Sequence, residues 1–106
     1  MADLDDSCCA VASDVAEPRE CVRAVDEVED ALGPVDVLVS NADVLRRDFV
    51  RDINVQDFED SYRVNVGAAL WLTQRVLPGM RERGYGRIAL VASELGLFGA
   101  PSHASY

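Results

Sequence analysis

Two stretches of this 106-residue sequence place small polar side chains where a ligand could be handled. VSNAD puts Ser40, Asn41 and Ala42 at the end of an apolar run, and Ser93 closes a second run thirteen residues before Tyr106. Small polar residues at the carboxyl ends of parallel strands leave room for a nucleotide and offer it hydrogen bonds.

Each of these signals also has a simpler interpretation. SNAD could be an ordinary turn after a strand. Asp14 ends the apolar run CAVAS, and it could contact an adenine ring or serve as a helix-capping carboxylate. His103 is the single histidine, and we expect it to be an exposed loop residue, with a place in the lining of a substrate pocket as the alternative.

The sequence GYGRIA at 84–89 fits the G-x-G-x-x-A pattern of phosphate-binding loops. That fingerprint must follow a strand and open a helix, so that the helix N-terminus faces the pyrophosphate. Here it follows a helical pattern and opens an apolar run. We therefore predict that GYGRIA is a helix cap and a turn.

The elements that must position these residues follow from hydrophobic periodicity. Continuous apolar runs predict buried parallel strands, and i, i+3, i+4 spacing predicts helices. The alternation indicates an α/β fold with a parallel sheet. The predicted strands are 9–13, 35–40 and 87–93, and the predicted helices are about 18–32 and 55–83.

Local signals fix the expected helix ends. Pro18 suits a first helical turn and Gly33 a C-terminal cap. Asn54 is the expected N-cap of the second helix, with bends expected near Gly67 and near Pro78. The middle of this helix, VGAALWLTQRVL, is apolar around most of its circumference. We expect either a second buried contact, such as a partner subunit, or a helix enclosed within its own domain.

Composition excludes several classes of protein. The formal charge of −9 argues against nucleic acid or an anionic membrane as a partner. No apolar run approaches 18 residues, and the acidic N-terminus does not resemble a signal peptide, so the cytoplasm is the expected location. The three cysteines fit no zinc spacing, and the acidic stretch at 3–6 is expected to be solvated, so we predict no metal site. All ten basic residues are arginine.

Taken in order along the chain, several motifs resemble the short-chain dehydrogenase/reductase family. They are DV at 14–15, LVSNAD at 38–43, VNVGA at 64–68, GRIALVAS at 86–93 and Tyr106. The resemblance implies that residues 1–106 are a single partial Rossmann-like NAD(P)-binding domain with a doubly wound parallel sheet. It also implies an oxidoreductase that transfers a hydride between NAD or NADP and a small-molecule alcohol or ketone.

The resemblance implies a role for each matching residue. Asp14 and the Val15 backbone would lie by the adenine ring, and Asn41 and Ala42 beside the cofactor ribose. Those four are the expected cofactor-binding residues.

Three further matches are the expected catalytic residues. Asn65 would help to hold a proton-relay water. Ser93 would hydrogen-bond the substrate oxygen, and Tyr106 would be the general acid/base.

The sequence departs from the family pattern at three points. The family's first two strands and the glycine-rich loop after the first are missing. Asp43 replaces a glycine, and no lysine follows Tyr106 by four residues. A phenol is a poor base at neutral pH without a nearby cation. We therefore expect the isolated 106 residues to be inactive and to bind the cofactor weakly or not at all.

The family's sheet order, 3-2-1-4-5-6-7, raises a question of pairing. The three predicted strands correspond to its third, fourth and fifth, so two strands are missing between 9–13 and 35–40. Strand 9–13 must stay unpaired or pair directly with 35–40. Because unpaired buried backbone is costly, we expect the closed, three-stranded sheet. The rival to an enzyme is a non-catalytic interaction module that pairs with a full-length homologue, or with itself, through helix 55–83.

Overall fold

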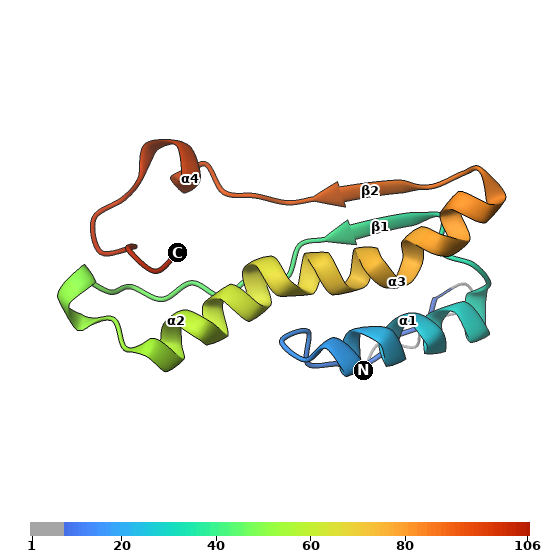
Figure 1. Cartoon of the computed structure of the whole chain (residues 1–106), viewed down its shortest axis with the longest axis horizontal. Coiled ribbons are helices and arrows are strands. Elements are labelled where there is room, and N and C mark those ends of the chain that lie inside the picture. Colours follow the sequence, from blue (N-terminus) through green and yellow to red (C-terminus); the bar gives the residue numbers. More distant parts are fainter. Residues whose placement is uncertain (1–7) are drawn as a thin grey trace.

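The computed structural model describes residues 8–106, so the acidic stretch at 3–6 lies outside the described residues. Two strands, β1 (Val37–Ser40) and β2 (Arg87–Leu90), pair in parallel, with Val37 opposite Arg87 and Ser40 opposite Leu90. Figure 1 shows the long helix α3 beside the two strands, with α1 on the other side of α3. The elements are α1 (Pro18–Leu32), β1 (Val37–Ser40), η1 (Val50–Asp52), α2 (Val55–Tyr62), η2 (Arg63–Gly67), α3 (Ala68–Arg83), β2 (Arg87–Leu90) and α4 (Leu95–Phe98).

The helix ends follow the local signals in the sequence. α1 begins at Pro18 and ends at Gly33, whose φ of 89° is in the region that favours glycine. Asn54 caps α2, because its side-chain oxygen accepts a hydrogen bond of 2.8 Å from the backbone N–H of Asp57. These three predictions are confirmed.

Helical structure continues without a break from Val55 to Arg83, through α2, η2 and α3. The expected irregularity near Gly67 is a π-helical segment, Arg63–Gly67, whereas Pro78 lies inside α3. A Cβ on Gly67 would lie 2.6 Å from the Trp71 ring, so the glycine lets this ring pack on the helix backbone. π-helical turns are frequent at functional sites.

The core lies between α1, α3 and β1. Val25 of α1 packs with Val76 and Met80 of α3, and Val35, Leu38 and Leu72 pack against this cluster. At its edge the guanidinium of Arg75 contacts Asp26 and Glu29 of α1. Hydrogen bonds to these carboxylates raise the pKa of the Arg75 guanidinium, with the larger effect from Asp26, so the side chain stays charged.

The prediction of a closed, three-stranded sheet is wrong. Residues 8–14 form no strand, and the sheet within residues 8–106 consists of β1 and β2. Hydrogen bonds with helix α1 take the place of strand pairing for some polar groups of this segment. Arg23 donates to the carbonyl of Ala12 at 2.6 Å, and the Ser13 hydroxyl donates to the carbonyl of Glu20 at 3.0 Å. The α/β class with parallel strand pairing is confirmed.

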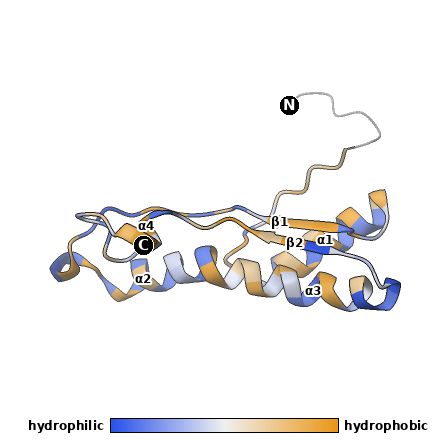
Figure 2. Ribbon diagram, turned by 90° about the horizontal axis from the view of Figure 1, so that it is seen from above, coloured by the Kyte–Doolittle hydropathy of each residue, from blue (hydrophilic) through white to orange (hydrophobic). Residues whose placement is uncertain are grey.

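The two observed strands are shorter than predicted, although their pairing extends beyond them. Arg87 N–H donates to the carbonyl of Asp36 and Val91 N–H to that of Ser40, both at 2.9 Å. The short helix α4 lies in a stretch expected to be loop. Figure 2 shows hydrophobic colour along β1 and a mixture of hydrophobic and hydrophilic residues along α3.

Candidate active site

The three predicted catalytic residues line one cleft at the carboxyl ends of β1 and β2. Asn65, Ser93 and Tyr106 border a space of about 250 Å³. Its other lining residues are Ala42, Asp43, Val66, Val91, Ala92 and Gly96. The structure therefore brings together residues that are up to 64 positions apart in the sequence.

Asn65 comes from the π-helical segment η2 and binds the backbone of one residue in the loop after β1. Its side-chain oxygen accepts a hydrogen bond of 2.8 Å from Val44 N–H, and its amide nitrogen donates one of 3.0 Å to the Val44 carbonyl. Both bonds are partly buried. The amide thus fixes the position of the loop, including Asp43 beside it.

Ser93 follows β2 and stands just before α4. Its hydroxyl oxygen accepts a hydrogen bond of 3.2 Å from Leu95 N–H. This contact uses an acceptor site of the hydroxyl and leaves its proton available to a ligand.

Tyr106 reaches the cleft from the C-terminal segment, which folds back over the loop after β1 (Figure 1). Ala104 N–H donates to the carbonyl of Asp48 at 3.3 Å, within an isolated bridge between Asp48 and His103. The phenol hydroxyl donates to Oδ2 of Asp43 at 3.2 Å. Sequence reasoning noted Asp43 as a departure from the family pattern but did not predict this contact.

A second cavity of about 450 Å³ adjoins the cleft and shares Ala42 and Asn65 with it. Ser40 and Thr73 add hydroxyls to a lining that is otherwise mostly apolar, with Leu70 and Leu90 among its members. Together the two spaces offer apolar walls with a few polar groups, which is the usual character of a small-molecule site.

The predicted cofactor-binding residues are not all in one place. Ala42 lines both spaces, whereas Asn41 is an exposed neighbour that lines neither. Asp14 lines a different cavity, of about 480 Å³, between the start of α1 and α2. Its side chain accepts a hydrogen bond of 2.9 Å from Ala16 N–H, so it supports a turn, while the N-cap of α1 is Glu17.

Val15 and His103 take part in local contacts. The Val15 carbonyl accepts a 3.5 Å hydrogen bond from the Cys21 thiol. Nδ1 of His103 lies 2.7 Å from the Pro101 carbonyl oxygen, and the ring borders neither the cleft nor the adjoining cavity.

Charge in the cleft comes from a single side chain. Asp43 is the one carboxylate among the lining residues, and no arginine lines the cleft. Within residues 8–106 no group of three or more histidine, cysteine, aspartate or glutamate side chains could hold a metal ion. In the same part of the chain, no helix has both the length and the apolar character needed to cross a membrane.

Comparisons with known proteins cover almost the whole chain. Residues 1–106 match the family described as short chain dehydrogenase. The chain is 34% identical over 93 residues to nodulation protein G of Azospirillum brasilense, covering 88% of this chain and 38% of that protein. It is also 34% identical over 96 residues to the 3-oxoacyl-acyl-carrier-protein reductase MabA of Mycobacterium avium, covering 91% of this chain and 38% of the relative.

A solved structure agrees with these sequence matches. The crystal structure of a short-chain dehydrogenase from Streptomyces avermitilis superposes with a TM-score of 0.84 at 28% identity, covering 92% of this chain and 36% of that one. The chain thus spans less than two fifths of the length of these proteins.

Proposed function

The chain belongs to the short chain dehydrogenase family, and we propose from this premise that it is part of an NAD(P)-dependent oxidoreductase acting on an alcohol or ketone. The observation that supports this most directly is the shared cleft of Asn65, Ser93 and Tyr106. A serine hydroxyl and a phenol bordering one small space can both bond a single substrate oxygen.

Each of these residues then has a defined task. Tyr106 donates its proton to the carbonyl oxygen during reduction and takes the hydroxyl proton during oxidation. Ser93 donates a hydrogen bond to the same oxygen and stabilises the charge that develops there. The nicotinamide, when bound, supplies the hydride to the carbon or accepts it. Asn65 positions the loop after β1 through Val44 and, by family resemblance, helps to hold a water that relays the proton.

The residues of this chain can contact the ribose and adenine parts of such a cofactor, but those that line the cleft offer no charge partner for its phosphates. We assign Asn41 and Ala42 to the ribose side and Asp14 and Val15 to the adenine side. The small side chain of Ala42 and the apolar cavity beside it support the first assignment. Neither the cleft nor this cavity is lined by an arginine, so the 106 residues alone offer no cation there to the phosphates. We therefore expect weak or absent cofactor binding, and no turnover, from the isolated chain.

A chimera tests these assignments. The matching segment of the mycobacterial reductase is exchanged for these 106 residues. Oxidation of NADH or NADPH by a 3-oxoacyl thioester is followed, since the name of that relative specifies this substrate class. Tyr106→Phe should lower kcat/KM about 100-fold or more, the size expected for losing a general acid. Tyr85→Phe is the matched control, because Tyr85 is exposed and lies outside the cleft. A folded chimera that is inactive, or equally active with Tyr106→Phe, would contradict the proposal.

A second candidate function is a non-catalytic interaction module that pairs through helix 55–83, with a full-length homologue or with itself. A stripe of exposed apolar side chains at helical spacing favours it. Its members are between 48% and 73% exposed, and they are Val55, Phe58, Tyr62, Val66 and Leu70. Apolar stripes of this kind mark helix-docking surfaces.

Light scattering separates this candidate from the enzyme. Leu70→Asp should abolish complexes of the chain with itself or with a full-length relative, whereas Leu97→Asp, at an exposed position on α4, should leave them unchanged. Equal complex formation by both variants would contradict pairing through the stripe. For either function we assign residues 1–106 to a single Rossmann-like domain in the cytoplasm. The charge of −9 argues against nucleic acid or an anionic membrane as a partner.

A further inference from the structure

Asp43 is the charged side chain of the cleft, and its polar contact within residues 8–106 is the hydroxyl of Tyr106. The phenol therefore presents its proton to Asp43 and not to the open space. A ligand oxygen that bonds Tyr106 has to take this hydrogen bond from the carboxylate. The carboxylate is then left needing another donor.

The backbone position of Asp43 is held by contacts of its neighbours along the chain. Val44, the next residue, is held by both amide atoms of Asn65. Ala42, the preceding residue, lines the cleft directly after the end of β1. A ligand that enters the cleft cannot avoid the carboxylate by a small shift of the loop, because such a shift would break the contacts of Asn65.

We propose that Asp43 determines the charge class of the ligand: the cleft accepts alcohols and ketones that carry a cationic or neutral hydrogen-bond donor next to the reacting carbon, and it rejects those with a carboxylate or phosphate there. An ammonium or hydroxyl group replaces the phenol as donor to Asp43, whereas an anion meets a like charge. This inference rests on the proposed function.

Three matched secondary alcohols test the inference directly. They are 1-amino-2-propanol, 1,2-propanediol and lactate, which share a CH3–CH(OH) unit whose carbinol carbon carries a CH2–NH3⁺, a CH2–OH or a carboxylate group, respectively. Each is titrated into the folded chimera, labelled with ¹⁵N, and the amide signals of Asp43, Ser93 and Tyr106 are followed. The amino alcohol should bind about three- to fivefold more tightly than the diol, the size expected for a solvent-accessible ion pair. Lactate should bind more weakly than the diol.

Substitutions assign this preference to one carboxylate. Asp43→Asn should bring the three dissociation constants together, and Asp43→Ser should do the same with a different side chain. Asp48→Asn is the matched control, because Asp48 is in the same loop but does not line the cleft, and it should keep the preference. Asp43 is exposed, so its replacement should leave the spectrum dispersed.

Three results would overturn the inference: lactate binding as tightly as the amino alcohol, a preference that survives Asp43→Asn, or no response of the cleft signals to the amino alcohol. Its failure is distinguishable from failure of the proposed function. An active, Tyr106-dependent chimera without charge preference in the titration would contradict the inference alone. A charge preference beside a folded but inactive chimera would contradict the oxidoreductase proposal alone.

Discussion

The side-chain oxygen and nitrogen of Asn65 both form hydrogen bonds with the backbone of one residue, Val44. They thereby connect the π-helical segment to the loop after β1. Each such hydrogen bond contributes about 1 kcal/mol, and more is lost when the partner is left unpaired in a partly buried place. This makes Asn65 a positioning residue for the cleft, quite apart from any contact with a ligand.

The first prediction concerns this amide. Asn65→Ala should lower the free energy of unfolding by about 1–3 kcal/mol and speed hydrogen exchange at Val44 N–H. Asn41→Ala is the control, because Asn41 has the same side chain, is exposed and lies three residues before Val44. Urea titration and amide exchange measure the two effects. Equal losses for the two variants would show that the amide does not hold the loop.

A second prediction concerns the thiols. Cys21 is fully buried, whereas Cys8 and Cys9 are exposed. Burial, helped by the charges of Asp14 and Glu20, raises the pKa of the Cys21 thiol and disfavours its reactive thiolate form. Iodoacetamide should label Cys8 and Cys9 first, as read by peptide mass spectrometry.

The raised pKa also sets a direction for stability. The unfolded chain releases the thiol proton at lower pH than the folded chain does, so the free energy of unfolding should fall as pH rises above the ordinary range of a thiol. Cys21→Ser should remove most of this alkaline loss. An unchanged pH dependence in that variant would assign the loss to other groups.

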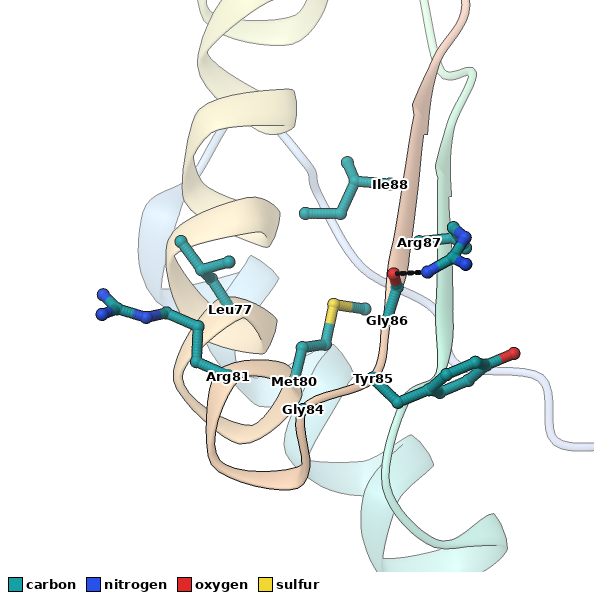
Figure 3. Close-up of a pocket in the computed structure, with 8 residues that line it drawn as sticks. All are labelled: Leu77, Met80, Arg81, Gly84, Tyr85, Gly86, Arg87 and Ile88. Atoms are coloured by element: carbon teal, nitrogen blue, oxygen red, sulfur yellow. Dashed lines mark hydrogen bonds between the residues drawn. The ribbon is translucent and has the colours of Figure 1, made fainter.

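At the scale of elements, the turn between α3 and β2 depends on two glycines with different tasks. Gly84 ends α3 with φ of 65°, as the sequence predicted for a helix cap. Gly86 makes room for a core side chain. A Cβ there would lie 2.5 Å from Cγ and Sδ of Met80, and Figure 3 shows Met80 extending from α3 toward Gly86 and Ile88.

The third prediction uses this contact. Gly86→Ala should cost about 1–3 kcal/mol of stability, because the Met80 side chain, which is part of the core cluster, would have to move. Gly96→Ala is the matched control, since nothing lies within 4 Å of its Cβ position. Thermal or urea unfolding compares them. If both variants unfold alike, Met80 has room to adjust.

The sequence predicted those elements whose signals are local. The helix ends were predicted from the conformational preferences of single residues. These residues are Pro18 and Asn54 at helix starts and Gly33 and Gly84 at C-terminal caps. The pairing of residues 9–13 was predicted wrongly, because strand pairing depends on distant backbone, and here contacts with α1 replace it.

The candidate site shows the same division. Motif order indicated Ser93 and Tyr106, and the structure gives both the same cleft. The contact of Tyr106 with Asp43 joins residues 63 positions apart and follows from the path of the C-terminal segment, for which no local pattern exists. α4 was missed because four residues give too little periodicity.

The whole molecule buries little of its apolar surface. Within residues 8–106 the buried hydrophobic residues are Cys21, Val25, Ala68, Val76 and Met80, while many large apolar side chains on α2, α3 and both strands are exposed. The radius of gyration is 16.2 Å, whereas a compact domain of this length has about 13 Å. In the part of the chain that the structure describes, each strand also has one edge unpaired, which favours association with other chains.

The last prediction follows from this balance. A core of a few side chains offsets little of the conformational entropy lost on folding 106 residues, so the isolated chain should be marginally stable or aggregate. Calorimetry with light scattering should find either a weak, broad transition or concentration-dependent assembly. Val39→Asp, on the exposed part of β1, should reduce assembly without a comparable loss of helix in circular dichroism. A monomer with a cooperative transition above about 60 °C, near the upper end for mesophile domains, would contradict this prediction. The exposed apolar surface would then not need to be buried by another chain for stability.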